Sequence, residues 1–286
     1  MKKFLTKLAQ YNRSYPIIPS VIMGLLIIAA IFAPLVATHD PIQGYLGDRE
    51  IPPMWLDGGS SEHILGTDQQ GKDLYSRVVY GARISMIIVL TVTVVGASVG
   101  TALGIIAGWY GKHIDEFIMR LVDFTLAVPF ILVALVVVIV FGQSFGMVIG
   151  LLAVFSWNGF ARQIRADSLQ IKNTEYVLSA KVAGASTLRI MAKHIFPGVI
   201  NTMTVVATLR VGGLILSEAI LSFLGAGIPK PTPAWGLMVA DGRDYLGTSW
   251  WIAFFPGLAI FLLVLSSNFL GDWLRDKLDP RLRQLS

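Results

Sequence analysis

The amino-acid sequence predicts an all-α integral membrane protein with six transmembrane helices and with both termini on the cytoplasmic side. Charged residues make up only 14% of the 286 residues, whereas about 25% is usual in soluble proteins. Hydrophobic residues make up 54%, and the mean hydropathy is +0.66. Long charge-free stretches and an uneven distribution of Lys and Arg complete a pattern that is typical of multi-pass membrane proteins.

The expected spans follow from apolar stretches of about 20 residues, the length that a helix needs to cross a lipid core of about 30 Å. No Asp, Glu, Lys or Arg occurs between residues 124 and 161. This stretch is too long for one crossing, so we expect a turn at 142–146 to divide it. The predicted spans are 17–36, 84–108, 121–141, 146–162, 199–225 and 250–271.

The distribution of basic residues predicts the orientation. With the N-terminus inside, 16 of the 23 Lys and Arg residues fall in inner segments and 6 in outer segments, and Arg210 lies within a span. This positive-inside bias places both termini in the cytoplasm. The first span is expected to be retained rather than cleaved, because its apolar stretch is longer than that of a usual signal peptide. The predicted organisation is a cytoplasmic tail at 1–16, the first span at 17–36, an extracytoplasmic loop at 37–83, a membrane core at 84–271 with a basic cytoplasmic loop at 162–197, and a cytoplasmic tail at 272–286.

The basic cytoplasmic loop is expected to form short helices rather than coil. Asn173 or Thr174 can cap a first helix, and Gly184 can end it. Val177, Ala180 and Gly184 then share a narrow face of small residues. Such a face suits docking into a groove on a partner protein, and an interfacial helix that rests on lipid headgroups fits the pattern equally well.

A family resemblance rests first on this loop, which contains Glu175-Tyr176-Val177, Ala180, Gly184-Ala185-Ser186, Leu188-Arg189 and His194-Ile195-Phe196-Pro197. These residues resemble the EAA loop of ABC-importer permease subunits, which carries the coupling helix that docks on the ATPase. Residues 63–68, 71–77, 120–129, 217–236 and 271–282 also resemble the C-type permease of the peptide/nickel branch. The chain departs from the family at Leu178-Ser179-Ala180, where Glu-Ala-Ala is usual.

The resemblance implies the type I ABC importer permease fold, with residues 84–271 as the permease core, in the inner membrane of a bacterium or archaeon. It also implies which residues take part in ATPase coupling: Glu175, Tyr176, Val177, Ala180, Gly184, Ala185, Ser186, Arg189 and Pro197.

The same resemblance implies partners and a substrate class. It predicts a second homologous permease subunit, two cytoplasmic ATPase subunits and an extracytoplasmic substrate-binding protein. The chain itself is expected to be non-catalytic, with ATP and Mg²⁺ bound by the partner ATPases. The expected solute is a di- or oligopeptide; nickel chelates, glutathione and oligosaccharides stay open.

Three ionisable residues lie at predicted membrane depth, where charge is costly and indicates a pathway or a buried pair. They are Asp123, Arg210 and Glu218, and we expect them to line the translocation pathway. Arg210 and Glu218 are about 12 Å apart along a helix and cannot pair directly. Asp123 is expected beside Arg120 at the inner membrane surface. A rival interpretation is an ion-coupled secondary transporter that uses Asp123 and Glu218, and a second is a non-transporting membrane scaffold.

Several other sites are not expected. Residues 66–72 fit most of a phosphate-binding loop, but Asp73 stands where Ser or Thr should hold Mg²⁺. The four histidines are scattered without the spacing of metal ligands. The absence of cysteine excludes disulfides and thiolate zinc sites. The positive charge is explained by the cytoplasmic loops, so no nucleic-acid partner is predicted.

Glycine recurs every fourth residue along the second span, at Gly96, Gly100, Gly104 and Gly108. This strip allows close approach of another helix. We expect that helix to belong to the same chain rather than to a partner subunit.

Overall fold

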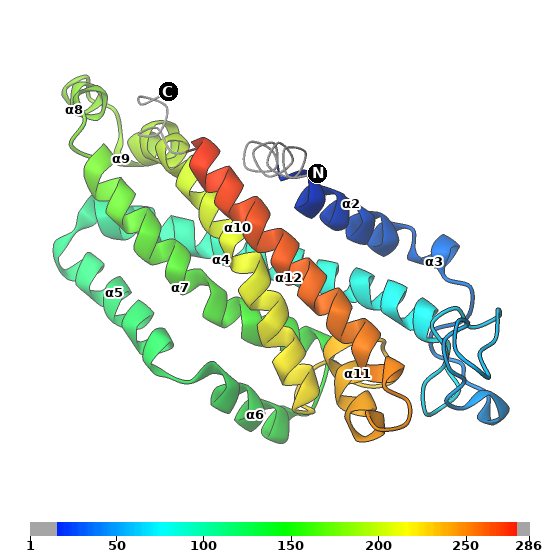
Figure 1. Ribbon diagram of the computed structural model, residues 1–286. Coiled ribbons are helices and arrows are strands. Elements are labelled where there is room, and N and C mark those ends of the chain that lie inside the picture. Colours follow the sequence, from blue (N-terminus) through cyan, green and yellow to red (C-terminus); the bar gives the residue numbers. More distant parts are fainter. Residues whose placement is uncertain (1–15, 279–286) are drawn as a thin grey trace.

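The computed structural model describes residues 16–278, and this part of the chain is helical, without a strand. Figure 1 shows long helices packed side by side, with short helices and loops at the two ends of the bundle. The elements in chain order are α2 (Ile17–Ile31), α3 (Ala33–Val36), η1 (Leu46–Asp48), α4 (Leu74–Tyr110), α5 (Lys112–Ala127), α6 (Phe130–Phe141), α7 (Phe145–Ile171), α8 (Glu175–Val182), α9 (Thr187–Ile190), η2 (Met191–Ile195), α10 (Phe196–Phe223), α11 (Trp235–Gly242), η3 (Arg243–Tyr245) and α12 (Trp251–Leu278).

The glycine strip of α4 packs against α7 of the same chain, as the sequence predicts. A Cβ atom on Gly104 would lie 2.7 Å from the carbonyl oxygen of Ala161, and one on Gly108 would lie 2.6 Å from the Cβ of Ser168. These distances are shorter than van der Waals contact, so the two backbones touch where the side chains are missing. This contact forms the centre of the bundle.

The two ends of the bundle carry different elements. We call the end that carries the loop before α4 the loop end, and the opposite end, which carries α8 and α9, the α8 end. The indole of Trp251, in the first turn of α12, donates to the carbonyl of Thr67 at the loop end. Ile17, the first residue of α2, and Trp273, near the end of α12, line one shallow pocket, so the first and last described helices both reach the α8 end.

The span count is only partly supported. Within residues 16–278, four helices are long and apolar enough to cross a membrane: α4, α7, α12 and the continuous run of α9, η2 and α10 from Thr187 to Phe223. The α5–α6 pair gives a fifth span if its bent halves are taken together, and α2 is a shorter apolar helix. The chain is thus a multi-pass membrane protein, and six spans with cytoplasmic termini stay a prediction.

The third predicted span, 121–141, is wrong as a single helix. The chain forms α5 and α6, which are bent by 80° relative to each other. Pro129 has no N–H to donate, and its ring forces Val128 into an extended conformation with ψ of 124°. The break therefore falls inside the apolar stretch, where hydropathy alone gives no sign of it.

Two predicted loops are shorter than expected because the neighbouring helices continue past the membrane-length stretch. The loop at 37–83 ends at residue 73, because Asp73 caps α4 by accepting from the amide of Ser76 at 2.8 Å. The loop at 162–197 begins only after Ile171, where α7 ends. Pro197 does not close the loop either: it lies in the first turn of α10, after the wider π turn of η2.

Candidate functional site

The first candidate site is the segment of α8 and α9 at the α8 end. Figure 1 shows α8 projecting from the bundle. Thr174 takes the N-cap position and Glu175 lies in the first turn, where its charge favours the helix N-terminus. Gly184, with φ of +78°, ends the turn after α8 in a conformation that suits glycine. Ser186 then stands at the N-cap position of α9.

The small-residue face of α8 is divided: Val177 and Ala180 pack into the protein, and Gly184 is exposed. Val177 is fully buried, and Ala180 and Ala185 pack against the same core cluster. The other buried members of this cluster come from α4, α7, α9, η2 and α10: Ile105, Ile164, Ile190, Ile195 and Val199. These residues hold α8 to its own bundle and leave other side chains to face outward.

The outward face of this segment carries four exposed apolar or aromatic side chains among polar ones. Val182 is 91% exposed and Leu188 is 73% exposed, and Tyr176 and Leu178 are also exposed. Arg189 lies exposed beside them. An exposed apolar surface of this kind is typical of a protein-interaction site.

Two lysines connect this segment with the end of α4. The ammonium of Lys172 donates to the carbonyl oxygen of Trp109 at 2.6 Å. Lys181, on α8, lies 4.5 Å from the centroid of the Trp109 indole, within the range of a cation–π contact. Lys181 therefore places α8 in direct contact with the end of α4.

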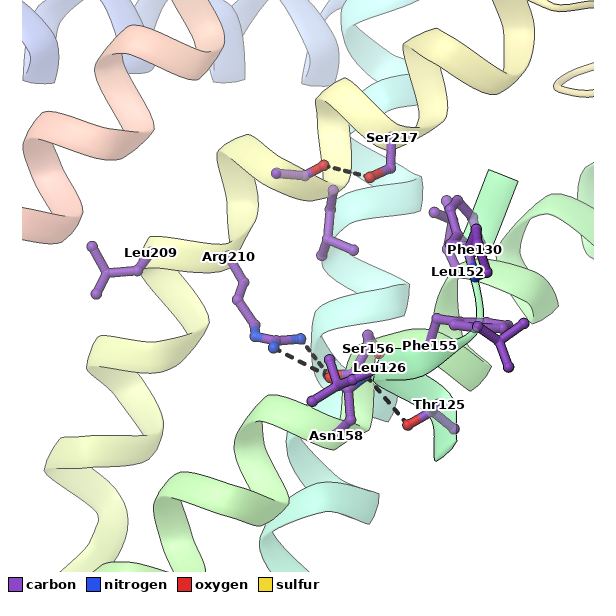
Figure 2. A pocket seen from close by; sticks show the side chains of 14 residues that line it. Thr125, Leu126, Phe130, Leu152, Phe155, Ser156, Asn158, Leu209, Arg210 and Ser217 are labelled. Atoms are coloured by element: carbon purple, nitrogen blue, oxygen red, sulfur yellow. Dashed lines mark hydrogen bonds between the residues drawn. The ribbon is translucent and has the colours of Figure 1, made fainter. Parts of the chain in front are cut away.

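The second candidate site is an open cavity of about 510 Å³ between three parts of the chain. Its wall comes from the α5–α6 break, the middle of α7 and the middle of α10 (Figure 2). The lining residues are Thr125, Leu126, Val128, Pro129, Phe130, Leu152, Phe155, Ser156, Asn158, Leu209, Arg210, Gly213, Leu214 and Ser217.

Arg210 is the one cation among these lining residues. Its guanidinium donates to the carbonyl oxygen of Ser156 at 2.7 Å and to the side-chain oxygen of Asn158 at 3.3 Å. Its charge also lies 5.6 Å from the Phe160 ring. These partners are neutral, so they orient the guanidinium without cancelling its charge. The arrangement can accept an anionic group of a solute.

Glu218 and Asp123 are not among the residues that line the cavity. Glu218 is 2% exposed and accepts a 2.6 Å hydrogen bond from the hydroxyl of Ser222 on the same helix. Asp123 is an exposed residue that forms an ion pair with Arg162 on α7. Arg120, its expected neighbour, pairs instead with Glu116 at 2.6 Å. The three ionisable residues therefore do not form one site.

Residues 66–72, which resemble a phosphate-binding loop, lie at the loop end, and two of their backbone amides already donate to a side chain of the same loop. The carboxylate of Asp68 accepts from the amides of Gln70 at 2.7 Å and Lys72 at 3.0 Å. A phosphate would need these same donors, so the geometry agrees with the rejection of a nucleotide site here.

Sequence reasoning missed two groupings. Asn158 and Ser217 are polar lining residues of the cavity. Each is a polar residue within an otherwise apolar helix, and this signal could have indicated a polar cavity between the helices. His39 and His63 meet at Asp73 at the loop end. No spacing rule could have found this cluster, because its members are brought together by the folding of an irregular loop.

Comparison with known proteins agrees with this geometry. The family described as binding-protein-dependent transport system inner membrane component matches residues 100–284. The chain is 41% identical over 261 residues to the di/tripeptide transport system permease protein DppC of Pseudomonas aeruginosa, with 91% of this chain and 86% of that relative covered. It is 38% identical over 264 residues to the dipeptide transport system permease protein DppC of Bacillus subtilis, with 92% and 81% covered. The chain therefore belongs to the family of inner membrane components of binding-protein-dependent transport systems.

Proposed function

We propose that this chain is a transmembrane permease subunit of an ATP-driven ABC importer that moves di- or oligopeptides, or a related small solute. The observation that carries the proposal is the α8–α9 segment, which is anchored to the bundle by Val177 and exposes Val182 and Leu188. The similarity to dipeptide permeases supports the substrate class. Membership of the family supports delivery by a substrate-binding protein.

The contacts give a route from the exposed segment to the cavity. α8 contacts Trp109 at the end of α4 through Lys181. α9 continues through η2 into α10 without a break, and α10 carries Arg210 into the cavity wall. Displacement of the α8–α9 segment by an ATPase would move both α4 and α10 and so change the access to the cavity.

The remaining subunits complete this proposal. A second homologous permease would close the open side of the cavity, and two cytoplasmic ATPases would bind ATP and Mg²⁺ and dock at the α8 end. An extracytoplasmic binding protein would deliver the solute at the loop end. In this arrangement the chain has six spans and cytoplasmic termini in the inner membrane of a bacterium or archaeon, and it catalyses no reaction itself.

Reconstitution into liposomes tests this function. We expect uptake of a labelled dipeptide only when the second permease, both ATPases, the binding protein and Mg-ATP are present. Uptake by this chain alone, driven by a proton or sodium gradient without ATP, would establish the rival ion-coupled transporter. Stable insertion with no uptake and no complex with the ATPases under any of these conditions would favour the scaffold interpretation.

Arg210 is expected to bind the α-carboxylate of a peptide in the cavity. Arg210→Gln should lower the uptake of a dipeptide about tenfold to a hundredfold, because a charge-assisted hydrogen bond contributes about 1.5–3 kcal/mol. Arg210→Lys keeps the charge but not the two-pronged geometry and should lose less. Uptake should be measured in the reconstituted complex, with the C-terminally amidated dipeptide as control. An equal loss for both peptides would contradict carboxylate recognition and leave the importer function intact.

A further inference from the structure

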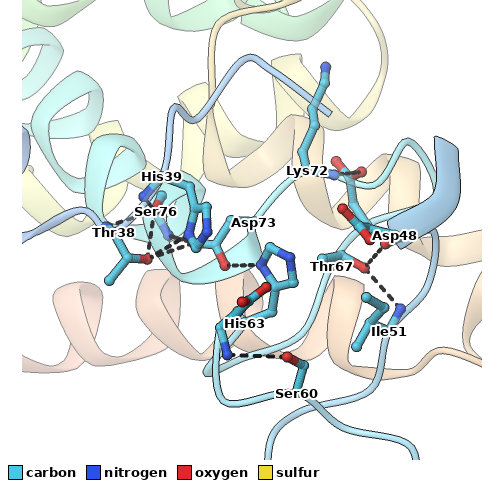
Figure 3. A network of polar contacts seen from close by, with 12 residues as sticks. Thr38, His39, Asp48, Ile51, Ser60, His63, Thr67, Lys72, Asp73 and Ser76 are labelled. Atoms are coloured by element: carbon cyan, nitrogen blue, oxygen red, sulfur yellow. Dashed lines mark hydrogen bonds and ion pairs between the residues drawn. The ribbon is translucent and has the colours of Figure 1, made fainter. Parts of the chain in front are cut away.

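Three side chains that can bind a metal ion meet at the loop end, from three separate segments of the chain (Figure 3). His39 follows α3, His63 lies in the long loop, and Asp73 caps α4. One ligand atom from each lies within 4.8 Å of the other two. The Nδ1 atom of His63 is 2.9 Å from one carboxylate oxygen of Asp73, and the Nδ1 atom of His39 is 3.8 Å from the other.

The carboxylate is held in place by its own helix. Asp73 is 2% exposed and His63 is 7% exposed. The amide of Ser76 donates to Oδ2 of Asp73 at 2.8 Å, which leaves Oδ1 directed at His63. The hydroxyl of Thr38 lies 3.0 Å from the Nδ1 atom of His39. The Ser76 contact orients the carboxylate, as hydrogen bonds to metal ligands do in proteins, whereas a metal ion on Nδ1 of His39 would replace the Thr38 contact.

Asp73 has no Lys or Arg side chain among its ion-pair partners in the described part of the chain. The ion-pair partners of Asp73 are the two histidines. The nearby guanidinium of Arg77 pairs with Asp68 instead, at 3.5 Å. A buried carboxylate flanked by two imidazoles thus has ligand atoms that a divalent cation can use together.

We propose that His39, His63 and Asp73 form a binding site for Zn²⁺. Two imidazole nitrogens and one carboxylate oxygen are a common ligand set for zinc, with bonds of about 2.0–2.2 Å and hence about 3.3 Å between ligand atoms in a tetrahedral site. The separations of 2.9 and 3.8 Å involve different oxygens of Asp73, so the three side chains lie close enough to share one ion but would have to shift to bind it through a single carboxylate oxygen. The His39 side chain is 39% exposed, so water can reach the fourth position.

The bound ion would have a structural role as a cross-link between segments of the chain. It would join the segment after α3 to the first turn of α4 and hold the loop between them through His63. This role is independent of the solute and of the ATPases, so it can be tested without transport.

The test is metal binding by the full chain, purified in detergent, freed of its affinity tag and treated with chelator. Calorimetric titration with ZnCl₂ should show one equivalent bound, and CoCl₂ should give the visible absorption band of a tetrahedral site. His39→Gln should weaken Zn²⁺ binding by more than about tenfold and abolish the cobalt band. His39 is exposed, so this variant is expected to fold.

Two further variants sharpen the result. Asp73→Asn keeps an acceptor for the Ser76 amide, so it should fold and still lose the metal. His113→Gln removes an exposed histidine of α5 and should bind Zn²⁺ as the wild type does. The absence of binding by the wild-type chain would overturn the proposal and leave His63 and Asp73 as a hydrogen-bonded pair. Equal affinities for wild type and His39→Gln would also overturn it, because His39 would then not be a ligand.

Discussion

Replacing Gly104 with valine is expected to destabilise the isolated chain by about 3 kcal/mol or more. A Cβ atom at this position would lie 2.7 Å from the carbonyl oxygen of Ala161 and 2.9 Å from the Cβ of Ile164. Both atoms belong to the framework of α7, so no flexible side-chain end can move aside. The branched side chain would therefore force α4 and α7 apart along the central contact of the bundle. Thermal unfolding in detergent measures the loss.

Gly150→Val is the matched control. Gly150 lies on α7, the other helix of the same pair, and no atom lies within 4 Å of a Cβ atom built there. This variant should unfold at nearly the same temperature as the wild type. If Gly104→Val were equally stable, the close packing of α4 on α7 would be wrong.

Gly184→Asp is expected to abolish uptake and weaken binding of the ATPases while leaving membrane insertion intact. Nothing lies within 4 Å of a Cβ atom built at Gly184, so the side chain fits its own protein. The carboxylate would stand near the exposed apolar residues Val182 and Leu188. If this surface is covered by the ATPase, the new charge would be buried unpaired, at a cost of about 3 kcal/mol or more. ATP hydrolysis that no longer depends on the solute-loaded binding protein would show the uncoupling directly.

Gly184→Asn separates the charge from the backbone effect. The positive φ of +78° disfavours any side chain, and Asn and Asp are among the residues that tolerate this conformation best. Asn has nearly the same size as Asp, so it should retain most of the uptake. Loss of activity in both variants would point to the backbone, and full activity in Gly184→Asp would refute docking at this surface.

The periodic features of the sequence predicted the helices better than their ends. The glycine strip of α4 identified a close helix contact, because the spacing of Gly104 and its neighbours places them on one helix face. The predicted span begins at residue 84, ten residues after the start of α4, since hydropathy follows lipid contact whereas the helix begins where Asp73 caps it. Pro129 indicates the α5–α6 break, but the long apolar stretch around this residue favours a single span.

Residues of the candidate sites were predictable only where an unusual residue type, such as a charged one, stood within an apolar helix. Arg210 was found because a charge inside an apolar helix is conspicuous, and the structure places it at the cavity. The sequence does not show which residues of the small-residue face are exposed: Val177 is buried and Gly184 is exposed, because the burial of a short helix depends on tertiary packing. The meeting of His39 with His63 depends on the path of an irregular loop, which local sequence does not encode.

The loop end is tied together by hydrogen bonds between distant parts of the chain. The indole of Trp235 donates to the carbonyl of Val78 at 2.8 Å, and the hydroxyl of Ser249 donates to Glu50 at 2.6 Å. The α8 end combines the apolar cluster around Val177 with polar contacts, among them the Arg165–Asp115 ion pair and the hydrogen bond from Lys172 to Trp109. In mechanical terms, a bundle held fixed at its loop end would act as a lever with its pivot at that end. Since α10 has 28 residues and is about 42 Å long, a tilt of about 5° at the pivot moves its far end by about 4 Å.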